Sequence, residues 1–457
     1  MFLSQRPANA IALVPIARED FDAWRQGADT ATATWVDLNG FKGQANQVCV
    51  LPDASGAPSR ALVGMNRNEW LYSLAAVPGA LQAGSCFVDA ELEPAAARLA
   101  TLGFALATYR FTRYGKTALK HIALTIPDDV NQTEVEADFR AIALVRDLIN
   151  TAPEDMMPQH LQAAVQSVAD HHGADLNTII GDDLLAQNYP AIHAVGRASV
   201  HAPRLINLTW GDVDAPKLTL VGKGVCFDSG GLDIKPASGM RHMKKDMGGA
   251  AHALALAQRV MAAGLNVRLR LLIPAVENAI SGNAFHPGDV LATRGGKTIE
   301  VDNTDAEGRL ILCDALTEAS AESPAQILDF ATLTGAARVA LGTELPAMFC
   351  NDDAVADALR SASQAVADPV WRMPLHQPYR QNLDSSIADM VNTPSVPFGG
   401  AITAALFLEA FIENDTSWAH FDIMAWNRAS RPGRPEGGEA MGLRACFEQL
   451  DQRFGRG

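Results

Sequence analysis

A short segment between residues 222 and 250 concentrates charge and glycine in an otherwise apolar sequence. Its charged side chains include Lys223, Asp228, Lys235 and Asp246, set among glycines that let the backbone approach a ligand closely. A lone lysine is usually a solvated surface residue, and Asp246, before an alanine-rich stretch, also suits a helix cap. The combination of acids and amines in one segment nevertheless indicates a catalytic or metal-binding site.

A second segment, residues 303–310 with the sequence NTDAEGRL, adds Asp305, Glu307 and Arg309. Taken alone, Thr304 and Glu307 have the spacing of a helix capping box. Four carboxylates from the two segments would repel each other unless cations neutralised them, as pairs of divalent ions do in hydrolases. With one exception, neither segment contains histidine. The donors are therefore mainly oxygen atoms, which suit Mn²⁺ or Mg²⁺ as well as Zn²⁺.

The elements that must position these segments are predicted as alternating strands and helices. Strands are expected at residues 204–210, 217–221, 267–273, 327–331 and 420–424. Helices are expected at residues 159–171, 247–263, 307–322, 354–367 and 401–412. Apolar strands that alternate with helices predict a mostly parallel sheet covered on both faces. Sites in such sheets lie at the carboxyl ends of strands, and Lys223 directly follows one of them.

The residues before about 130 are predicted to form a separate, small α/β unit. Strands are expected at residues 47–51, 61–65, 107–111 and 121–126, with a helix at 91–106. A further helix at 135–149 is expected to end before Pro153. The predicted organisation is an N-terminal α/β domain (1–134), a linking helix (135–152) and a larger catalytic α/β/α domain (153–457).

Composition narrows the class of protein. The 457 residues are 48% hydrophobic and 19% charged, which suits a substantial core and excludes a disordered chain. A net charge of −15 argues against nucleic acid as a partner. The six scattered cysteines form no CxxC pair, which argues against disulfides or a thiolate zinc site. Without a signal-peptide pattern or a long apolar run, the simplest expectation is a soluble cytoplasmic protein with no membrane partner.

At the two charged segments the sequence resembles a known family, the leucyl aminopeptidase (cytosol aminopeptidase) family of dinuclear metallopeptidases. The resemblance rests on NTDAEGRL and on the spacing of the lysines and aspartates in the first segment. Further matches are RDLINT at 146–151, ATLTGA at 331–336 and GGAITAA at 399–405. It covers about residues 135–430 and is weak before residue 130.

The resemblance implies a ligand set for two divalent metal ions, Mn²⁺ or Zn²⁺. One ion would be held by Lys223, Asp228, Asp246 and Glu307. The other, more exchangeable, would be held by Asp228, Asp305 and Glu307, with the Asp305 backbone carbonyl assisting. A lysine ligand must be neutral, and burial beside two dications lowers its pKa.

The resemblance also implies the reaction, hydrolysis of the N-terminal peptide bond of peptides by a water that bridges the two ions. Lys235 would stabilise the oxyanion that forms on the attacked carbonyl. Arg309 would hold a bicarbonate ion for proton transfer. The family assembles as a hexamer of two trimers, so a homohexamer is expected.

Substrate contacts are expected from Met243 and from the loop that contains Thr332, Leu333 and Gly335. A flexible methionine fills irregular apolar gaps, which favours first residues such as Leu. Residues 424–427, with the sequence MAWN, replace a more glycine-rich turn that the family pattern suggests. This departure leaves the preference for the first residue open.

Two other functional classes fit a cluster of carboxylates. A two-metal phosphoesterase usually recruits histidines and an arginine fork for phosphate, and histidine is scarce in both segments. A non-catalytic role, including the DNA binding of some family members, would be favoured by loss of a ligand. All seven candidate positions are intact, and the acidic net charge weakens binding to nucleic acid.

Overall fold

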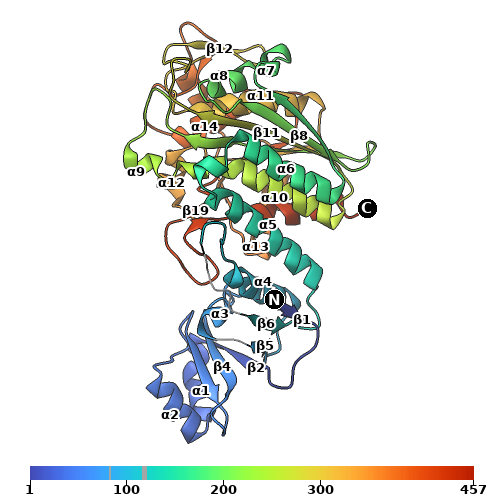
Figure 1. Cartoon of the computed structure of the whole chain (residues 1–457), viewed down its shortest axis with the longest axis vertical. Coiled ribbons are helices and arrows are strands. Elements are labelled where there is room, and N and C mark those ends of the chain that lie inside the picture. Colours follow the sequence, from blue (N-terminus) through green and yellow to red (C-terminus); the bar gives the residue numbers. More distant parts are fainter. Residues whose placement is uncertain (82–83, 116–120) are drawn as a thin grey trace. The chain divides into compact units, whose positions relative to one another are not determined.

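The computed structural model describes residues 1–81, 84–115 and 121–457 (Figure 1). The chain divides into two compact units, residues 1–143 with 428–436 and residues 144–427 with 437–457. The division falls within helix α5 (Gln132–Asn150). Every residue proposed for catalysis, metal binding or substrate contact lies in the second unit.

The first unit is built on a sheet in which six described strands have the order β1-β6-β5-β2-β4-β3. Neighbouring strands are parallel except for β3 and β4. The strands are β1 (Phe2–Leu3), β2 (Ile11–Ala17), β3 (Val48–Pro52), β4 (Pro58–Met65), β5 (Gly84–Val88) and β6 (Ile122–Thr125). The helices are α1 (Phe21–Gly27), α2 (Thr30–Leu38), α3 (Val77–Ala80) and α4 (Pro94–Thr108). The prediction of a small α/β unit is confirmed.

One predicted strand of this unit is wrong. Residues 107–111 do not form a strand, because α4 continues to Thr108 and the described residues after it are irregular. Residues 100–107 of α4 are all buried, so this part of the helix is buried on every side and lacks the usual helical periodicity. The inner strand β2 was not predicted, and it contains Pro15, a residue that normally argues against an inner strand.

The second unit is built on a nine-stranded sheet with the order β16-β15-β18-β14-β9-β11-β8-β7, in which β10 also pairs with β11. The central strands β18, β14, β9 and β11 are parallel, and β8, β7 and β15 pair antiparallel with their inner neighbours. The strands are β7 (Asp175–Ile180), β8 (Arg204–Trp210), β9 (Lys217–Gly222), β10 (Gly224–Asp228), β11 (Arg268–Asn278), β14 (Gln326–Ala331), β15 (Ala347–Cys350), β16 (Trp371–Arg372) and β18 (Trp418–Asp422). Small additional sheets contain β12 (Val290–Ala292), β13 (Thr298–Glu300), β17 (Met390–Val391), β19 (Trp426–Asn427) and β20 (Gly437–Gly438).

Helices cover both faces of this sheet, as the alternating pattern predicts. Figure 1 shows α6 (Pro158–His172) and α10 (Gly248–Ala263) on one face and α8 (Pro190–Gly196) and α11 (Glu307–Ala321) on the other. The remaining helices are α7 (Asp183–Ala186), α9 (Ala237–Met240), α12 (Gly335–Leu341), α13 (Asp353–Ala365), α14 (Gly400–Glu409) and α15 (Leu443–Phe454). Pro158 begins α6, and left-handed glycines end α6 and α10. No helix in the described ranges is both long enough and apolar enough to cross a bilayer.

The predicted elements of the second unit are confirmed, with shifted boundaries. β8 has the predicted bounds, whereas β11 continues five residues beyond its prediction, to Asn278. Pro274 lies inside β11, at the point where the strand that pairs with β11 changes from β9 to β10. A proline cannot donate to a ladder, so it fits the break between these two strands. The residue in that break is Lys223.

Candidate metal centre

The site is built at the carboxyl ends of the parallel strands. Lys223 follows β9, Thr332 follows β14, Asp422 ends β18 and Asn278 ends β11. Lys223 is fixed through its backbone, since its N–H donates to the Phe330 carbonyl (3.0 Å) and its carbonyl accepts from the N–H of Ala250 (2.9 Å). The sheet therefore brings residues from distant parts of the sequence to one edge, as expected for an α/β fold.

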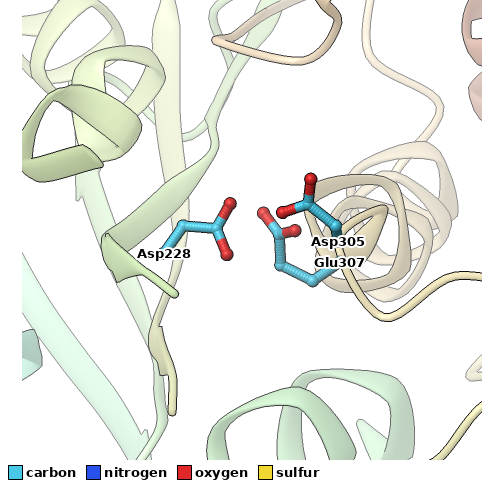
Figure 2. Close-up of side chains that lie close together, drawn as sticks. All are labelled: Asp228, Asp305 and Glu307. Carbon is cyan, nitrogen blue, oxygen red and sulfur yellow. The ribbon is translucent and has the colours of Figure 1, made fainter. Parts of the chain in front are cut away.

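Three carboxylates converge at this edge (Figure 2). Asp228 ends β10, Glu307 is the first residue of α11, and Asp305 precedes it in the loop. One oxygen atom from each of the three lies within 4.8 Å of the others. Asp228 and Glu307 are buried, whereas the side chain of Asp305 is 33% exposed. The two charged segments of the sequence thus form one cluster.

Lys223 and Asp246 complete the buried side of this cluster. Lys223 Nζ lies 2.7 Å from Asp246 Oδ2, 3.0 Å from Glu307 Oε1 and 3.2 Å from the Thr332 carbonyl oxygen. Asp246 lies in a 3₁₀ helix (Met243–Met247), and its Oδ1 accepts a hydrogen bond from Thr332 Oγ1 (2.7 Å). Asp246 does not cap α10, whose first turn receives no side-chain cap.

Lys235 lies on the more open side of the cluster. Its Nζ is 2.7 Å from Asp228 Oδ2 and also contacts Asp305 Oδ1, and its side chain is 14% exposed. Lys235 therefore links two carboxylates that come from different segments. A cation in this position can act on negative charge that develops beside the cluster.

Burial and crowding shift the pKa values of these groups in opposite directions. Burial and the neighbouring carboxylates Asp228 and Asp246 raise the pKa of Glu307 to about 8. Burial and Asp246 likewise raise the pKa of Asp228 to about 6. Burial would raise the pKa of Asp246, but Lys223 and Lys245 lower it to about 2. The lysines of the cluster therefore do not supply enough positive charge to stabilise all of its carboxylates in the ionised form.

The two lysines respond to the same field. Burial lowers the pKa of Lys223, but the carboxylates of Asp246, Glu307 and Asp228 outweigh burial and raise it above its ordinary value. Burial also lowers the pKa of Lys235, but the carboxylates of Asp228 and Glu307 outweigh burial and raise this pKa above its ordinary value. Both amines are therefore cationic within this carboxylate cluster at neutral pH.

The donor set fits divalent cations. Glu307 Oε2 is buried and accepts no hydrogen bond from the described residues, while Glu307 Oε1 and Asp246 Oδ2 face only the Lys223 ammonium, at 3.0 and 2.7 Å. A buried carboxylate oxygen without a partner is costly unless a cation binds it, and one lysine does not neutralise two carboxylates. Carboxylates at this separation, with one amine, provide hard oxygen donors and a single nitrogen donor. The residues present thus fit divalent metal ions.

Glycines allow the close approach of the elements. A Cβ atom on Gly308, in the first turn of α11, would lie 2.6 Å from Lys223 Cε. A Cβ atom on Gly249 would lie 2.0 Å from the Phe330 carbonyl oxygen, where α10 meets the end of β14. A side chain at Gly249 would force α10 away from the sheet, and one at Gly308 would displace the Lys223 side chain.

Thr304 and Glu307 do not form a capping box at the start of α11. The N-cap residue of α11 is Ala306, and it provides no side-chain cap. Thr304 instead donates through Oγ1 to the Gly230 carbonyl (2.6 Å) and accepts from the N–H of Asp233 (2.9 Å). Thr304 therefore joins the two charged segments to each other.

Arg309 lies beneath this loop. Its Nη1 donates to the Asn392 carbonyl (2.7 Å), and its buried Nε has no hydrogen-bond partner among the described residues. Burial lowers the pKa of Arg309 to about 10, so the side chain remains cationic at neutral pH. The Asn392 side chain donates to the Asn303 carbonyl (2.7 Å) and accepts from the N–H of Asp302 (2.9 Å). Asn392 thus holds both Arg309 and the loop.

Of the residues expected to contact substrate, Thr332 touches the cluster through Lys223 and Asp246, and the others lie near Asp246 or Thr332 in the sequence. Met243 is half-buried and begins the 3₁₀ helix that contains Asp246. Thr332 and Leu333 follow β14, and Gly335 begins α12. Asp422 Oδ1 accepts from the N–H groups of Leu333 (3.0 Å) and Thr334 (3.1 Å), which fixes the loop.

Sequence reasoning missed two residues that hold the site together, Asn278 and Asn392. Asn278 donates to Asp228 Oδ1 (2.9 Å) and to the Thr304 carbonyl (3.1 Å). Both asparagines are fully buried, and each lies at or directly after the end of a strand, β11 or β17. A polar residue at the carboxyl end of an apolar strand is the signal that could have identified them.

Comparisons with known proteins agree with this geometry. The model of the cytosol aminopeptidase family catalytic domain matches residues 143–447, and that of the M17 aminopeptidase N-terminal domain matches residues 11–127. Peptidase B of Cronobacter sakazakii is 45% identical over 333 residues, which are 71% of this chain and 78% of that protein.

Solved structures extend the similarity to the whole chain. The crystal structure of cytosol aminopeptidase from Coxiella burnetii has a TM-score of 0.95 and 48% identity, and the match covers 99% of both chains. The bottromycin maturation enzyme BotP in complex with Mn has a TM-score of 0.88 and 32% identity, covering 98% of this chain and 100% of that one.

A mostly parallel sheet with this carboxylate cluster at its edge, together with these matches, defines a metal-dependent aminopeptidase. The chain belongs to the cytosol aminopeptidase family. The resemblance inferred from the two charged segments is thereby confirmed.

Proposed function

We propose that the enzyme hydrolyses the N-terminal peptide bond of peptides at a centre of two divalent metal ions. It would prefer peptides whose first residue is apolar, such as Leu. The observation that carries this proposal is the convergence of Asp228, Asp305 and Glu307 within 4.8 Å, with Lys223 and Asp246 beside them. Glu307 Oε2 accepts no hydrogen bond from the described residues and Oε1 faces only the Lys223 ammonium, which suits an acid shared by two cations.

One ion would be held by Lys223, Asp228, Asp246 and Glu307, and the other by Asp228, Asp305 and Glu307 with the Asp305 carbonyl. When bound, divalent ions supply Lewis acidity, which lowers the pKa of a bridging water and polarises the scissile carbonyl. Lys223 is cationic within the carboxylate cluster, so it must release its proton before it can act as a ligand. We propose Mn²⁺ or Zn²⁺ as the ions, and the Mn complex of BotP supports Mn²⁺.

Lys235 and Arg309 supply the positive charges that the reaction requires. Lys235 lies beside Asp228 and Asp305, where it would stabilise the negative charge that develops on the attacked carbonyl oxygen. All the acids of the cluster are used as ligands in this arrangement, so none is free to act as a general base. Arg309, with its buried Nε unpaired among the described residues, would hold a bicarbonate ion that transfers the proton.

Substrate specificity would depend on the side chains that border the cluster. Met243 would contact the first side chain, and its flexible thioether favours apolar groups. Thr332, Leu333 and Gly335 would align the substrate backbone, since Asp422 holds this loop in place. The wider assignment, a cytoplasmic homohexamer that acts on peptides, rests on membership of the family.

The experiment is hydrolysis of a leucine anilide by protein stripped of metal and then supplied with Mn²⁺ or Zn²⁺. Activity should return with metal, and it should be lost in both Glu307→Ala and Lys235→Ala. A phosphoester assayed in parallel should not be cleaved. If several aminoacyl anilides remain uncleaved while metal is bound, the proposal is wrong.

A further inference from the structure

Asn278 is placed where the two halves of the metal centre meet. It is the last residue of β11, it is fully buried, and its backbone pairs in register with Asp228. Its carbonyl oxygen accepts hydrogen bonds from the N–H (3.2 Å) and the Oγ (2.6 Å) of Ser229. The backbone of Asn278 therefore supports the loop that directly follows Asp228.

The side chain of Asn278 connects this loop to the other charged segment. Its Nδ2 donates to Asp228 Oδ1 (2.9 Å) and to the Thr304 carbonyl (3.1 Å), the residue before Asp305. A carboxylate and a carbonyl are both acceptors, so only the nitrogen end of the amide suits this position. Both amide hydrogens are thus used, one on each half of the site.

The opposite end of the same amide has no partner. Asn278 Oδ1 is buried and accepts no hydrogen bond from the described residues. A Cβ on Gly231 would lie 2.9 Å from this oxygen, so the glycine leaves the room that the amide occupies. A buried acceptor without a partner is unfavourable for folding. We therefore infer that the role of Asn278 lies in the two hydrogen bonds that its Nδ2 donates.

These contacts determine which oxygen of Asp228 faces the cluster. Oδ1 accepts from the N–H of Gly230 (2.8 Å) and from Asn278, whereas Oδ2 lies 2.7 Å from Lys235 Nζ. Two donors hold Oδ1 on the side of the loop. Asp228 therefore presents Oδ2 to a cation, in contrast to Glu307, whose Oε2 accepts no hydrogen bond from the described residues and whose Oε1 faces only the Lys223 ammonium.

We propose that Asn278 is a positioning residue that orients the Asp228 carboxylate and fixes it relative to the Thr304–Asp305 peptide, so that both halves bind metal together. This role presupposes the two-metal centre of the proposed function. Residues that orient metal ligands typically change metal affinity or activity by about 10- to 100-fold when they are mutated. Loss of both donors should weaken metal binding in that range.

The test measures Mn²⁺ binding to metal-stripped protein from the electron paramagnetic resonance signal of free Mn²⁺. Asn278→Ala should raise the dissociation constant about 10- to 100-fold. With Mn²⁺ saturating, its KM for a leucine anilide should stay unchanged, since Asn278 lies outside the proposed substrate loop. Asn278→Ser retains one hydroxyl donor and should weaken binding less, which covers the case in which the alanine variant does not fold.

The matched control is Asn207→Ala in the neighbouring strand β8. Asn207 accepts a hydrogen bond from Arg270 Nε (3.1 Å) and pairs with Leu272, six residues before Asn278 in β11. The Asn207→Ala variant should lose stability without losing Mn²⁺ affinity. If Asn278→Ala and Asn278→Ser bind Mn²⁺ as the control does while the wild type binds and cleaves normally, the role of Asn278 is refuted. If the wild type itself neither binds Mn²⁺ nor cleaves anilides, the proposed function fails first.

Discussion

Replacing Gly308 with alanine tests how closely the start of α11 must pack on Lys223. A Cβ at this position would lie 2.6 Å from Lys223 Cε, 2.8 Å from Cδ and 2.7 Å from Nζ. Non-bonded carbon atoms prefer a separation of about 3.5–4.0 Å. The lysine side chain must therefore move by about 1 Å, because the backbone of Lys223 is fixed to Phe330 and Ala250.

The expected loss concerns activity more than stability. A displacement of about 1 Å in a catalytic arrangement can reduce the rate about 100-fold, so kcat/KM should fall by that factor. Alanine favours a helix over glycine by about 0.5–1 kcal/mol. Overpacking costs about 1–3 kcal/mol. The free energy of unfolding of Gly308→Ala should therefore fall by no more than about 2.5 kcal/mol.

The assay is hydrolysis of a leucine anilide at saturating Mn²⁺, with urea denaturation of the same samples. Gly239→Ala is the matched control, because Gly239 lies in α9 between Lys235 and Asp246 and its added Cβ would meet no atom within 4 Å. The control should keep wild-type activity. Equal activity of Gly308→Ala and Gly239→Ala would refute the close packing of α11 on Lys223.

Three further predictions concern stability. Burial lowers the pKa of His252 to about 4, and its Nε2 accepts from the Met441 N–H (2.9 Å). About 3 kcal/mol of stability should be lost as pH falls from about 6.5 to 4, and a profile equally steep in His252→Gln would contradict this. Arg146→Ala leaves Glu439 without its bidentate partner (both N–O distances 3.0 Å), so urea denaturation should show a loss of about 3–5 kcal/mol. Mn²⁺ at about 100 times its dissociation constant should add about 2.7 kcal/mol per bound ion to the free energy of unfolding, measured by thermal unfolding, and Glu307→Gln should lose most of that gain.

The sequence predicted the second unit well because its signals are local. Apolar strands such as β8 and β14 and alanine-rich helices such as α10 can be recognised from the residue pattern of a short segment. The first unit was predicted less well. There α4 is buried on nearly every side, and β2 contains a proline, so both lack the usual pattern.

The candidate site divides in the same way. The motif around Asp305 and the lysine and aspartate spacing before it could be recognised, because each lies within one short segment. Asn278 and Asn392 were missed, because each is a single amide whose role depends on strands brought together by the fold, and its place at the end of a strand was the only local signal. Their contribution is a property of the tertiary structure.

The most direct test of the two-metal centre is the number of Mn²⁺ ions bound per chain by metal-stripped protein, measured by equilibrium dialysis. The proposed centre, in which Asp228, Asp305 and Glu307 converge, predicts two ions per chain. Asp228→Ala and Glu307→Ala should each reduce this number, since both residues would serve both ions. A wild-type value of one or zero, or two ions retained in both variants, would contradict the account.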